Sequence, residues 1–318
     1  MKASTTNDVL THAVGTRKLK RGARDRESVT LVGLTFPGAL FYAFFVLAPV
    51  IIGLILSLTN WNGLAPPKYV GLSNFAAILH DPAMATSLLV TVEYIGITWI
   101  IQCSVSMAIG IYFAGRPRVA KWLGPVFMMP LMFSSVAIAI TWQYLLDPNL
   151  GVLAQSLRAV GLGHFIVDWL GNSTLAVYVV GAIASWQFIS FYTLLFQVGA
   201  QQIPRELIEA ATLDGATQWH VWRHILLPQL KYTTSLVSIL IVIGGLTGFE
   251  YVYILTDGGP GSATTTLGLY TYSTAFQSAQ LGYANALSMV MVVLGLILAL
   301  VLVAISRFGR MESQLEGM

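Results

Sequence analysis

The sequence has little charge for its length. Of its 318 residues, 10% are charged and 56% are hydrophobic, whereas about 25% of the residues of an average soluble domain are charged. The mean hydropathy is +0.72. The composition therefore excludes an ordinary soluble domain and predicts a polytopic, all-α membrane protein.

Cysteine and phosphate-binding loops are also scarce or absent. The one cysteine, Cys103, lies in an apolar segment, which excludes a disulfide framework within the chain and predicts a small buried hydrophobe. The sequence has no Gly-Lys pair, so it lacks the phosphate loop of an ATPase. We expect no cofactor in this chain, no catalytic constellation and no enzyme activity. ATP and Mg²⁺ would have to be bound by another chain.

Histidine is the other scarce residue that bears on function. Only His220 and His224, of five histidines, are spaced so that they share a helix face, and they lack the glutamate of an H-E-x-x-H site. No metal site is predicted; contact with a partner or with water is the expectation for this pair.

Six long apolar segments are what the sequence does contain. A bilayer core of about 30 Å requires roughly 20 apolar residues per helix. The segments that meet this requirement are approximately 31–58, 86–113, 123–145, 174–198, 233–255 and 285–305. The first is too long for a cleavable signal peptide. We therefore expect a basic cytoplasmic tail at 1–30 and one transmembrane domain at 31–318.

The basic residues orient these segments. Lys and Arg are retained on the cytoplasmic side of membrane proteins, and 15 of the 17 lie in the tail, in the loops 114–122 and 199–232, and after the last segment. The alternate loops hold only Lys68 and Arg158. Both termini and the 199–232 loop are therefore predicted to be cytoplasmic. Because the basic residues lie beside membrane spans, the net charge of +3 does not indicate nucleic-acid binding.

The 199–232 loop contains the longest stretch that resembles soluble protein, "EAATLDGATQWHVWRHILLPQL". Pro204 suits the first turn of a helix, and Gly215 suits the left-handed residue that ends it. Thr217 is the expected N-cap of a second helix that reaches about Ile225 and is terminated by Pro228. Two short helices joined by a tight turn suit insertion into a groove on a cytoplasmic partner. The alternative is a loop that merely connects two spans.

The spacing in this loop resembles the EAA motif of inner-membrane permease subunits of binding-protein-dependent ABC importers. The residues that carry the likeness are Glu209, Ala210, Ala211, Asp214, Gly215, Ile225, Leu227 and Pro228. The stretches "SLTNWNG", "YVGLSNFAAIL" and "FEYVYILTDGGPGSATTTLGLYTYSTAF" resemble the carbohydrate-uptake, maltose-permease-like branch of that family.

The resemblance implies a type I importer fold with six transmembrane helices in the inner membrane of a bacterial-type cell. It further implies a second permease subunit, two ATPase subunits and an extracytoplasmic binding protein as partners. The EAA loop would dock in a cleft of the ATPase, with Glu209 facing basic groups, Ala210 and Ala211 allowing close packing, and Gly215 making the turn. The chain lacks the extra spans and the large outer domain of the best-known maltose-type subunit.

Two acidic residues within the spans are candidates for the substrate path. An ionisable side chain in hydrocarbon costs about 2.5 to 3.5 kcal/mol on insertion scales, so Glu93 and Glu250 should face the bundle interior or water. Glu250 is predicted to lie in the outer half of its span, accompanied by Phe249, Tyr251 and Tyr253. A carboxylate beside aromatic rings suits a sugar. A helix contact or a water-facing position is the alternative for each acid.

Trp186 and Gln187 form a further polar and aromatic pair inside a span. We include them among the path candidates, although packing or anchoring at the membrane interface explains such pairs more often.

The sequence alone leaves the cargo open. An acidic residue on the path favours neutral mono- or oligosaccharides over sugar phosphates, but carriers of glycerol phosphate or other polyols resemble the same branch. An ion-coupled secondary transporter that uses Glu93 or Glu250 as a proton site is a rival from a different class. A membrane enzyme is a third.

Overall fold

The structure is a computed structural model that describes residues 36–306. The predicted 1–30 tail and both chain ends lie outside these residues. Residues up to Ile55 and residues from Leu56 onward form two separate compact units, and each is described by itself. The first unit is helical from residue 36, with a π-helical turn, η1 (Ala43–Leu47), followed by α2 (Ala48–Ser57). Most of its large apolar side chains are exposed, as expected of a helix that faces lipid.

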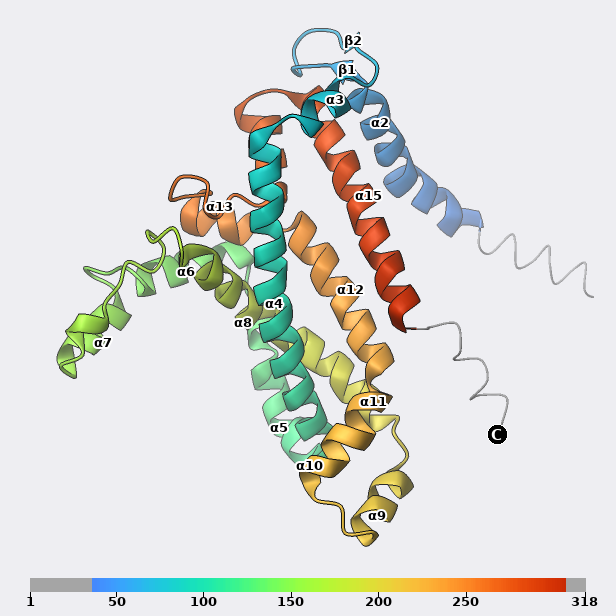
Figure 1. Ribbon diagram of the computed structural model, residues 1–318, viewed down its shortest axis with the longest axis vertical. Helices are drawn as coiled ribbons and strands as arrows, with labels where there is room; N and C mark the ends of the chain where they lie inside the picture. The colour runs from blue at the N-terminus through green and yellow to red at the C-terminus, as the bar shows by residue number, and fades with distance from the viewer. Residues whose placement is uncertain (1–35, 307–318) are drawn as a thin grey trace, which may run out of the picture. The chain divides into compact units, whose positions relative to one another are not determined.

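The second unit is almost entirely helical (Figure 1). A two-stranded antiparallel hairpin pairs β1 (Thr59–Asn60) with β2 (Lys68–Tyr69). The helical elements are α3 (Ser73–Leu79), α4 (Pro82–Gly115), α5 (Pro117–Phe127), η2 (Met129–Met132), α6 (Ser135–Leu145), α7 (Val152–Ala159), η3 (Gly163–Phe165), α8 (Ala176–Gln201), α9 (Arg205–Leu213), α10 (Gln218–Val221), η4 (Trp222–Leu226), α11 (Leu227–Gln229), α12 (Lys231–Thr247), α13 (Glu250–Thr256), α14 (Leu267–Tyr272), η5 (Ser273–Gln277) and α15 (Leu281–Ser306).

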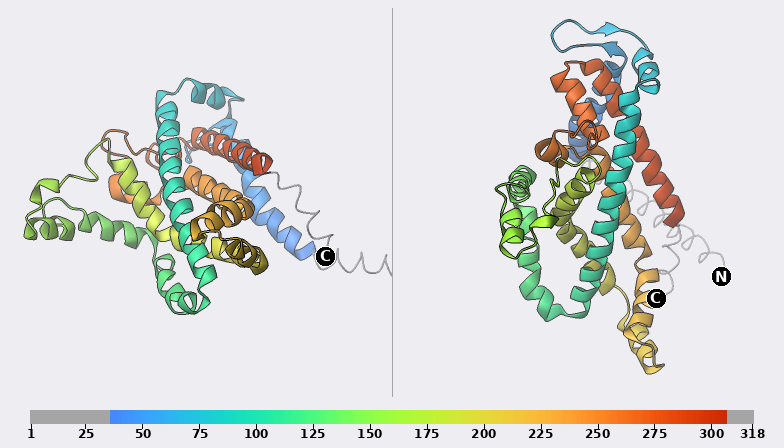
Figure 2. Two further views of the ribbon diagram at one scale, coloured as in Figure 1. Left: turned by 60° about the horizontal axis from the view of Figure 1, so that its bottom comes forward. Right: turned by 60° about the vertical axis from the view of Figure 1, so that its left-hand side comes forward.

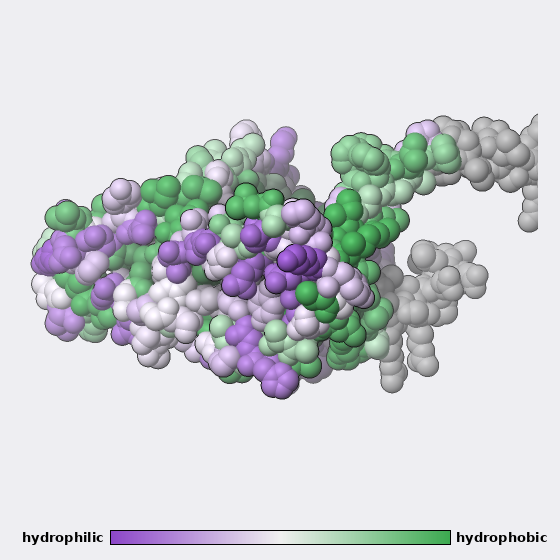
Figure 3. Space-filling view, turned by 90° about the horizontal axis from the view of Figure 1, so that it is seen from above, coloured by the Kyte–Doolittle hydropathy of each residue, from purple (hydrophilic) through white to green (hydrophobic). Residues whose placement is uncertain are grey.

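Helix α4 is the central element of this unit. It packs along α8 and also against α12, and α15 packs on α12. The hairpin and α3 lie at one end of the unit, and α9 to α11 lie at the other (Figures 1 and 2). We call these the hairpin end and the loop end. Hydrophilic residues are spread across the hairpin end (Figure 3), which suits a surface that meets water.

Three apolar clusters are stacked along α4. The hairpin-end cluster includes Met84 and Leu287, the central cluster includes Val90 and Tyr94, and the loop-end cluster includes Cys103. Cys103 is 4% exposed, which confirms that it is a buried hydrophobe. The clusters matter for function because a polar cavity lies between the central cluster and the loop-end cluster.

Close packing of α4 on α8 depends on small residues. A methyl group added at Gly110 would lie 2.6 Å from Cβ of Phe196 and 2.9 Å from the carbonyl oxygen of Thr193. Both distances are too short for van der Waals contact. By contrast, a methyl group at Gly96, also on α4, would meet no atom within 4 Å.

We therefore predict that Gly110→Ala lowers stability by about 1–3 kcal/mol, the usual cost of overpacking a core. Gly96→Ala, its matched control on the same helix, should be neutral or slightly stabilising, because alanine is the better helix former. Thermal unfolding of the detergent-solubilised protein measures both. Equal melting temperatures for the two variants would contradict the close crossing of α4 and α8.

The predicted spans are confirmed in part. Four helices are long and apolar enough to cross a membrane: Phe36–Ser57, Pro82–Gly115, Ala176–Gln201 and Leu281–Ile305. Two further pairs pass the same test together but are bent, by 90° between Pro117–Met132 and Ser135–Leu145 and by 65° between Gln218–Gln229 and Lys231–Thr247. The described chain thus has four candidate spans, or six if each bent pair is one span.

The predicted spans over 123–145 and 233–255 are not single helices in the structure. In the first, Phe133 and Ser134 are extended, with ψ of 146° and 138°, after the helical turn that contains Pro130. In the second, α12 stops at Thr247 because Gly248 is extended, with ψ of 125°. A side chain at Gly248 would lie 2.7 Å from the carbonyl oxygen of Gly244, so this break requires glycine.

Pro228 was predicted to terminate the second helix of the 199–232 loop, and this prediction was wrong. The helix continues through Pro228 to Gln229, and the bend follows at Leu230. A π-helical turn, η4, precedes Pro228 just as η1 precedes Pro49. Proline lacks the N–H that would bond four residues back, and its ring crowds that carbonyl group. Widening the preceding turn accommodates both effects.

Asp81 ties three helices together near the hairpin end. It caps α4 by accepting the N–H of Ala83 at 2.9 Å, and it accepts the hydroxyls of Tyr270 at 2.5 Å and Tyr283 at 2.7 Å. Partial burial raises the pKa of Asp81, but these hydrogen bonds outweigh burial and hold the pKa below its ordinary value. The charged carboxylate therefore stabilises the folded chain.

We predict that Asp81→Ala lowers stability by about 2 kcal/mol, through the lost cap and the unpaired hydroxyls. Because the folded pKa is lowered, the contribution of Asp81 is fully present above about pH 4 and is lost as the pH falls through the folded value. The difference in melting temperature between wild type and Asp81→Ala should thus shrink below about pH 4. Asp147→Ala is the control, since Asp147 bonds only the nearby N–H groups of Asn149 and Leu150. A larger effect for that control would contradict the role of Asp81.

Candidate functional site

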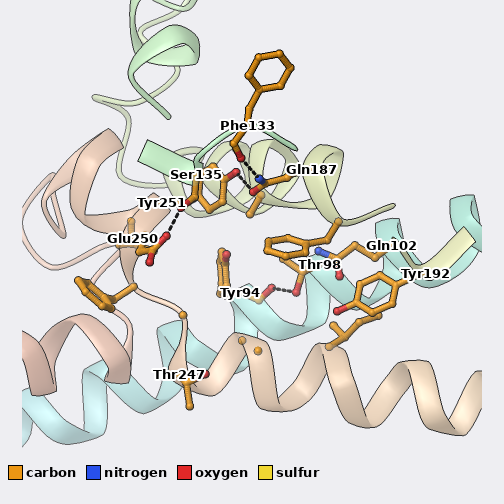
Figure 4. A pocket seen from close by; sticks show the side chains of 18 residues that line it. Tyr94, Thr98, Gln102, Phe133, Ser135, Gln187, Tyr192, Thr247, Glu250 and Tyr251 are labelled. Atoms are coloured by element: carbon orange, nitrogen blue, oxygen red, sulfur yellow. Dashed lines mark hydrogen bonds between the residues drawn. The ribbon is translucent and has the colours of Figure 1, made fainter. Parts of the chain in front are cut away.

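A cavity of about 550 Å³ lies between the central cluster and the loop-end cluster. Its walls come from α4, α8, α12 and the two breaks, one before α6 and one before α13 (Figure 4). The site therefore depends on two breaks between helices, at Phe133–Ser134 and at Gly248. The two breaks add Ser135 and Glu250 to the cavity wall, beside polar side chains from α4 and α8.

The break before α13 supplies the cavity's acid. Glu250 is the first residue of α13 and is exposed, and it lies on a separate short helix after the end of α12. Ser135, the first residue of α6, donates a hydrogen bond through Oγ to Oε2 of Glu250. Glu250 is the only charged residue among the described residues that line the cavity.

Gln187 of α8 holds the neighbouring polar groups. Its Nε2 donates to the carbonyl oxygens of Phe133 at 2.9 Å and Pro130 at 3.4 Å. Its Oε1 accepts the hydroxyl of Tyr251. Gln187 and Tyr251 are 5% and 6% exposed. The bond to Phe133 gives a partner to a carbonyl group at the break before α6, whereas the carbonyl group of Pro130 also accepts the N–H of Phe133 at 3.3 Å.

The opposite wall is formed by α4 and is also polar. Tyr94, Thr98 and Gln102 recur every four residues and line the cavity. Nε2 of Gln102 donates to Oγ of Ser185 at 3.3 Å. Tyr192 of α8 adds another aromatic side chain to the lining. Carboxylate, amide and hydroxyl groups among aromatic rings can bind a polyhydroxylated molecule through hydrogen bonds and ring stacking.

Four of the predicted path residues line this cavity: Phe249, Gln187, Glu250 and Tyr251. The other three are not among its lining residues: Glu93, Trp186 and Tyr253.

The three that fall outside the lining have other surroundings. Glu93 is exposed on α4. Trp186 is 46% exposed, and its ring packs edge-on against Trp142 at 6.0 Å. The ring of Tyr253 lies 5.3 Å from that of Tyr272.

Sequence reasoning missed the α4 wall and Ser135. The signal for the wall was present, because Tyr94, Thr98 and Gln102 form a polar stripe at helical spacing within an apolar segment. No comparable signal marks Ser135, since its place in the site depends on the break before α6.

The EAA loop folds at the loop end as two helices around Gly215. Gly215 has φ of +83°, and its N–H donates to the carbonyl oxygen of Thr212 at 3.1 Å. The N–H of Ala216 donates to the carbonyl oxygen of Ala211 at 2.9 Å. This pair of bonds is the Schellman motif that ends a helix with a left-handed residue. The side-chain oxygen of Thr217 accepts the N–H of His220 at 3.4 Å, so both predicted caps are confirmed.

The residues of the EAA motif mostly face solvent in this chain. Glu209, Ala210, Asp214, Leu227 and Pro228 are exposed. Ala211 and Ile225 are partly buried. Helix α9 contains no buried residue, so it is not held by a core of its own. His220 and His224 stack with their ring centres 5.6 Å apart on the following helix.

Comparison with known proteins identifies the family. Residues 106–310 match the family described as "Binding-protein-dependent transport system inner membrane component". The chain belongs to this family. Its members are transporter permease subunits rather than a class of catalytic enzyme.

Individual relatives of this permease match over most of their length. The probable ABC transporter permease protein YurN of Bacillus subtilis is 33% identical over 278 residues, covering 86% of this chain and 95% of the relative. The trehalose/maltose transport system permease protein MalF of Thermococcus litoralis is 29% identical, covering 84% of this chain and 90% of the relative.

A solved structure has the same fold as this permease. It is a chain of a bacterial ABC transporter involved in the import of the acidic polysaccharide alginate, with a TM-score of 0.76 and 21% sequence identity. The match covers 90% of this chain and 98% of that chain. The permease therefore has a type I ABC importer fold.

Proposed function

We propose that this permease forms half of the translocation path for a sugar, a mono- or oligosaccharide, in an ATP-driven importer. The observation that carries the proposal is the cavity between the two apolar clusters, in which Glu250 stands beside Phe249 and Tyr251. A carboxylate accepts hydrogen bonds from sugar hydroxyls, and aromatic rings cover the apolar face of a pyranose. None of the described lining residues is Lys, Arg or His, which disfavours an anionic cargo.

The names of relatives support the same class of cargo. Besides the trehalose/maltose protein, a multiple sugar-binding transport system permease protein, MsmF of Streptococcus mutans, is 29% identical to this chain. The family depends on a binding protein. We therefore propose that an extracytoplasmic binding protein delivers the sugar, and that the chain assembles with a second, similar permease and two ATPase subunits.

We also propose the topology that this assembly requires. Counting each bent pair as one span gives six spans, with both termini in the cytoplasm, in the inner membrane of a bacterial-type cell. The basic residues of the 114–122 and 199–232 loops support this orientation. The loop end would then face the cytoplasm, and the EAA loop would meet the ATPase there.

Transport would proceed by alternating access across the cavity. Members of both clusters line the cavity, such as Tyr94 of the central cluster and Tyr192 of the loop-end cluster. ATP binding would bring the two ATPase subunits together, move the EAA loops and open the outer side to the binding protein. Hydrolysis would reverse the movement and release the sugar inward.

The test is transport by the whole assembly. The complex would be purified in mild detergent, its subunits identified by mass spectrometry, and ATP-dependent uptake of labelled sugars, polyols and glycerol phosphate measured in proteoliposomes with the binding protein added. The proposal predicts co-purification of an ATPase and uptake of a neutral sugar. If glycerol phosphate were the only compound taken up, the cargo would be glycerol phosphate rather than a neutral sugar. Uptake by this chain alone, driven by a proton gradient, would overturn the importer.

A further inference from the structure

Gln187 lies between the break before α6 and the start of α13, and each of its side-chain polar atoms bonds protein. Its amide nitrogen is close to the carbonyl oxygens of Phe133 and Pro130, before α6. Its amide oxygen accepts the hydroxyl of Tyr251, in α13. The side chain is 5% exposed. A sugar in the cavity would therefore meet a Gln187 whose amide nitrogen and oxygen are both already bonded to protein, although the residue lines the wall.

The chemistry of this contact admits few substitutes. Two carbonyl oxygens can only accept hydrogen bonds, so the atom facing them must be a donor. The hydroxyl of Tyr251 donates, so the atom facing it must be an acceptor. A neutral amide supplies both from one rigid group, whereas a carboxylate would place negative charge against two carbonyl oxygens.

The contacts of Gln187 close a ring that contains the acid. Phe133 is two residues from Ser135, Ser135 donates to Glu250, and Glu250 adjoins Tyr251, which returns to Gln187. The ring joins α6, α8 and α13 (Figure 4). The ring links the two breaks, because Ser135 follows one break and both Glu250 and Tyr251 follow the other.

We propose that Gln187 is a positioning residue, which fixes Glu250 and Ser135 relative to each other without touching the cargo. This inference rests on the proposed function, because it takes Glu250 as the group that binds the sugar. Glu250 is exposed and follows a break that contains glycine, so its own helix does little to hold it. Anchoring Tyr251 and Phe133 on α8, a long helix that packs along α4, holds the two ends of the Ser135–Glu250 hydrogen bond in place.

A double-mutant cycle tests the inference. Residues that act as a unit show strongly non-additive effects. We expect Glu250→Ala to lower sugar uptake per assembled complex about 30-fold and Gln187→Met about tenfold. The double variant should remain near the 30-fold loss of Glu250→Ala, rather than the roughly 300-fold loss expected of independent groups. Uptake is measured in proteoliposomes with saturating binding protein, and complex assembly by quantitative blotting.

Tyr251→Phe and Gln102→Met complete the design. Tyr251→Phe removes one oxygen and leaves the ring in the central cluster, so it tests the same link if Gln187→Met does not assemble, and its effect should likewise vanish in the Glu250→Ala background. Gln102 is an equally buried glutamine of the same cavity, but it bonds Ser185 of α8 and neither break. In the double variant, the fold losses of uptake caused by Gln102→Met and by Glu250→Ala should multiply.

The outcomes separate the two proposals. No loss of uptake with Glu250→Ala would count against Glu250 as the sugar's ligand and hence against the proposed function. A loss with Glu250→Ala that multiplies fully with Gln187→Met, or with Tyr251→Phe, would overturn only the role of Gln187. Normal uptake in both Gln187→Met and Tyr251→Phe would overturn that role as well.

Discussion

Glu209→Lys is expected to lower ATP-dependent sugar uptake at least about 30-fold while the chain still inserts and assembles in the membrane. Glu209 is exposed on α9 at the loop end, and α9 buries no side chain, so the substitution disturbs no core. In an interface with an ATPase, however, reversing a charge places like charges together and costs several kcal/mol. The measurements are sugar uptake and binding-protein-stimulated ATPase activity in the same proteoliposomes. Uptake should fall, and ATPase activity should no longer respond to the binding protein.

Glu206→Lys is the matched control for Glu209→Lys. Glu206 is exposed on the same helix, in its first turn, where a carboxylate is favoured by the helix dipole. If only helix stability or net charge mattered, Glu206→Lys would be at least as harmful. We expect less than about a twofold loss of uptake for it. Equal losses in the two variants would remove Glu209 from the proposed contact with the ATPase.

The turn at Gly215 offers a second test of the same contact. Gly215 has φ of +83° and open space around it, so Gly215→Val strains only the backbone, by roughly 1–2 kcal/mol. Gly161 has φ of +76° and equally open surroundings in another loop, which makes Gly161→Val the control. We expect uptake to fall only with Gly215→Val, since only that turn sets the angle between α9 and α10.

Glu250→Ala is expected to lower sugar uptake about 30-fold, because the loss of a hydrogen bond to a charged group costs about 2 kcal/mol. Glu250→Gln should retain part of the activity, because the amide oxygen still accepts hydrogen bonds from Ser135 or from a sugar hydroxyl. The measurement is uptake at saturating binding protein, normalised to assembled complex.

Glu93→Ala is the control for Glu250→Ala. Both are glutamates within predicted spans, but Glu93 lies on an exposed part of α4 and does not line the cavity. We expect its uptake to stay within about twofold of wild type. Equal and small effects of the two substitutions would show that Glu250 does not lie on the sugar's path.

Much of the membrane architecture could be predicted because it depends on the lipid bilayer rather than on contacts between helices. A bilayer demands long apolar helices, and those segments are legible without any tertiary contact; four of the six were recovered as continuous helices. The EAA loop was equally predictable, since the positive φ of Gly215 and the cap at Thr217 are set by residues within a few positions. The wrong end point at Pro228 had a local cause too, because the chain widened the turn before the proline instead of stopping.

The site could not be predicted to the same extent. The sequence by itself determined that this is a multi-span permease and that Glu250, Tyr251 and Gln187 were polar groups in need of partners. Only the tertiary structure decided which partners they have. The bonds of Gln187 to Phe133 and Tyr251 span 54 and 64 residues, and they exist because the breaks before α6 and α13 both lie against α8. Such a break is stable only when another element satisfies its backbone groups, so it depends on packing that no local pattern encodes.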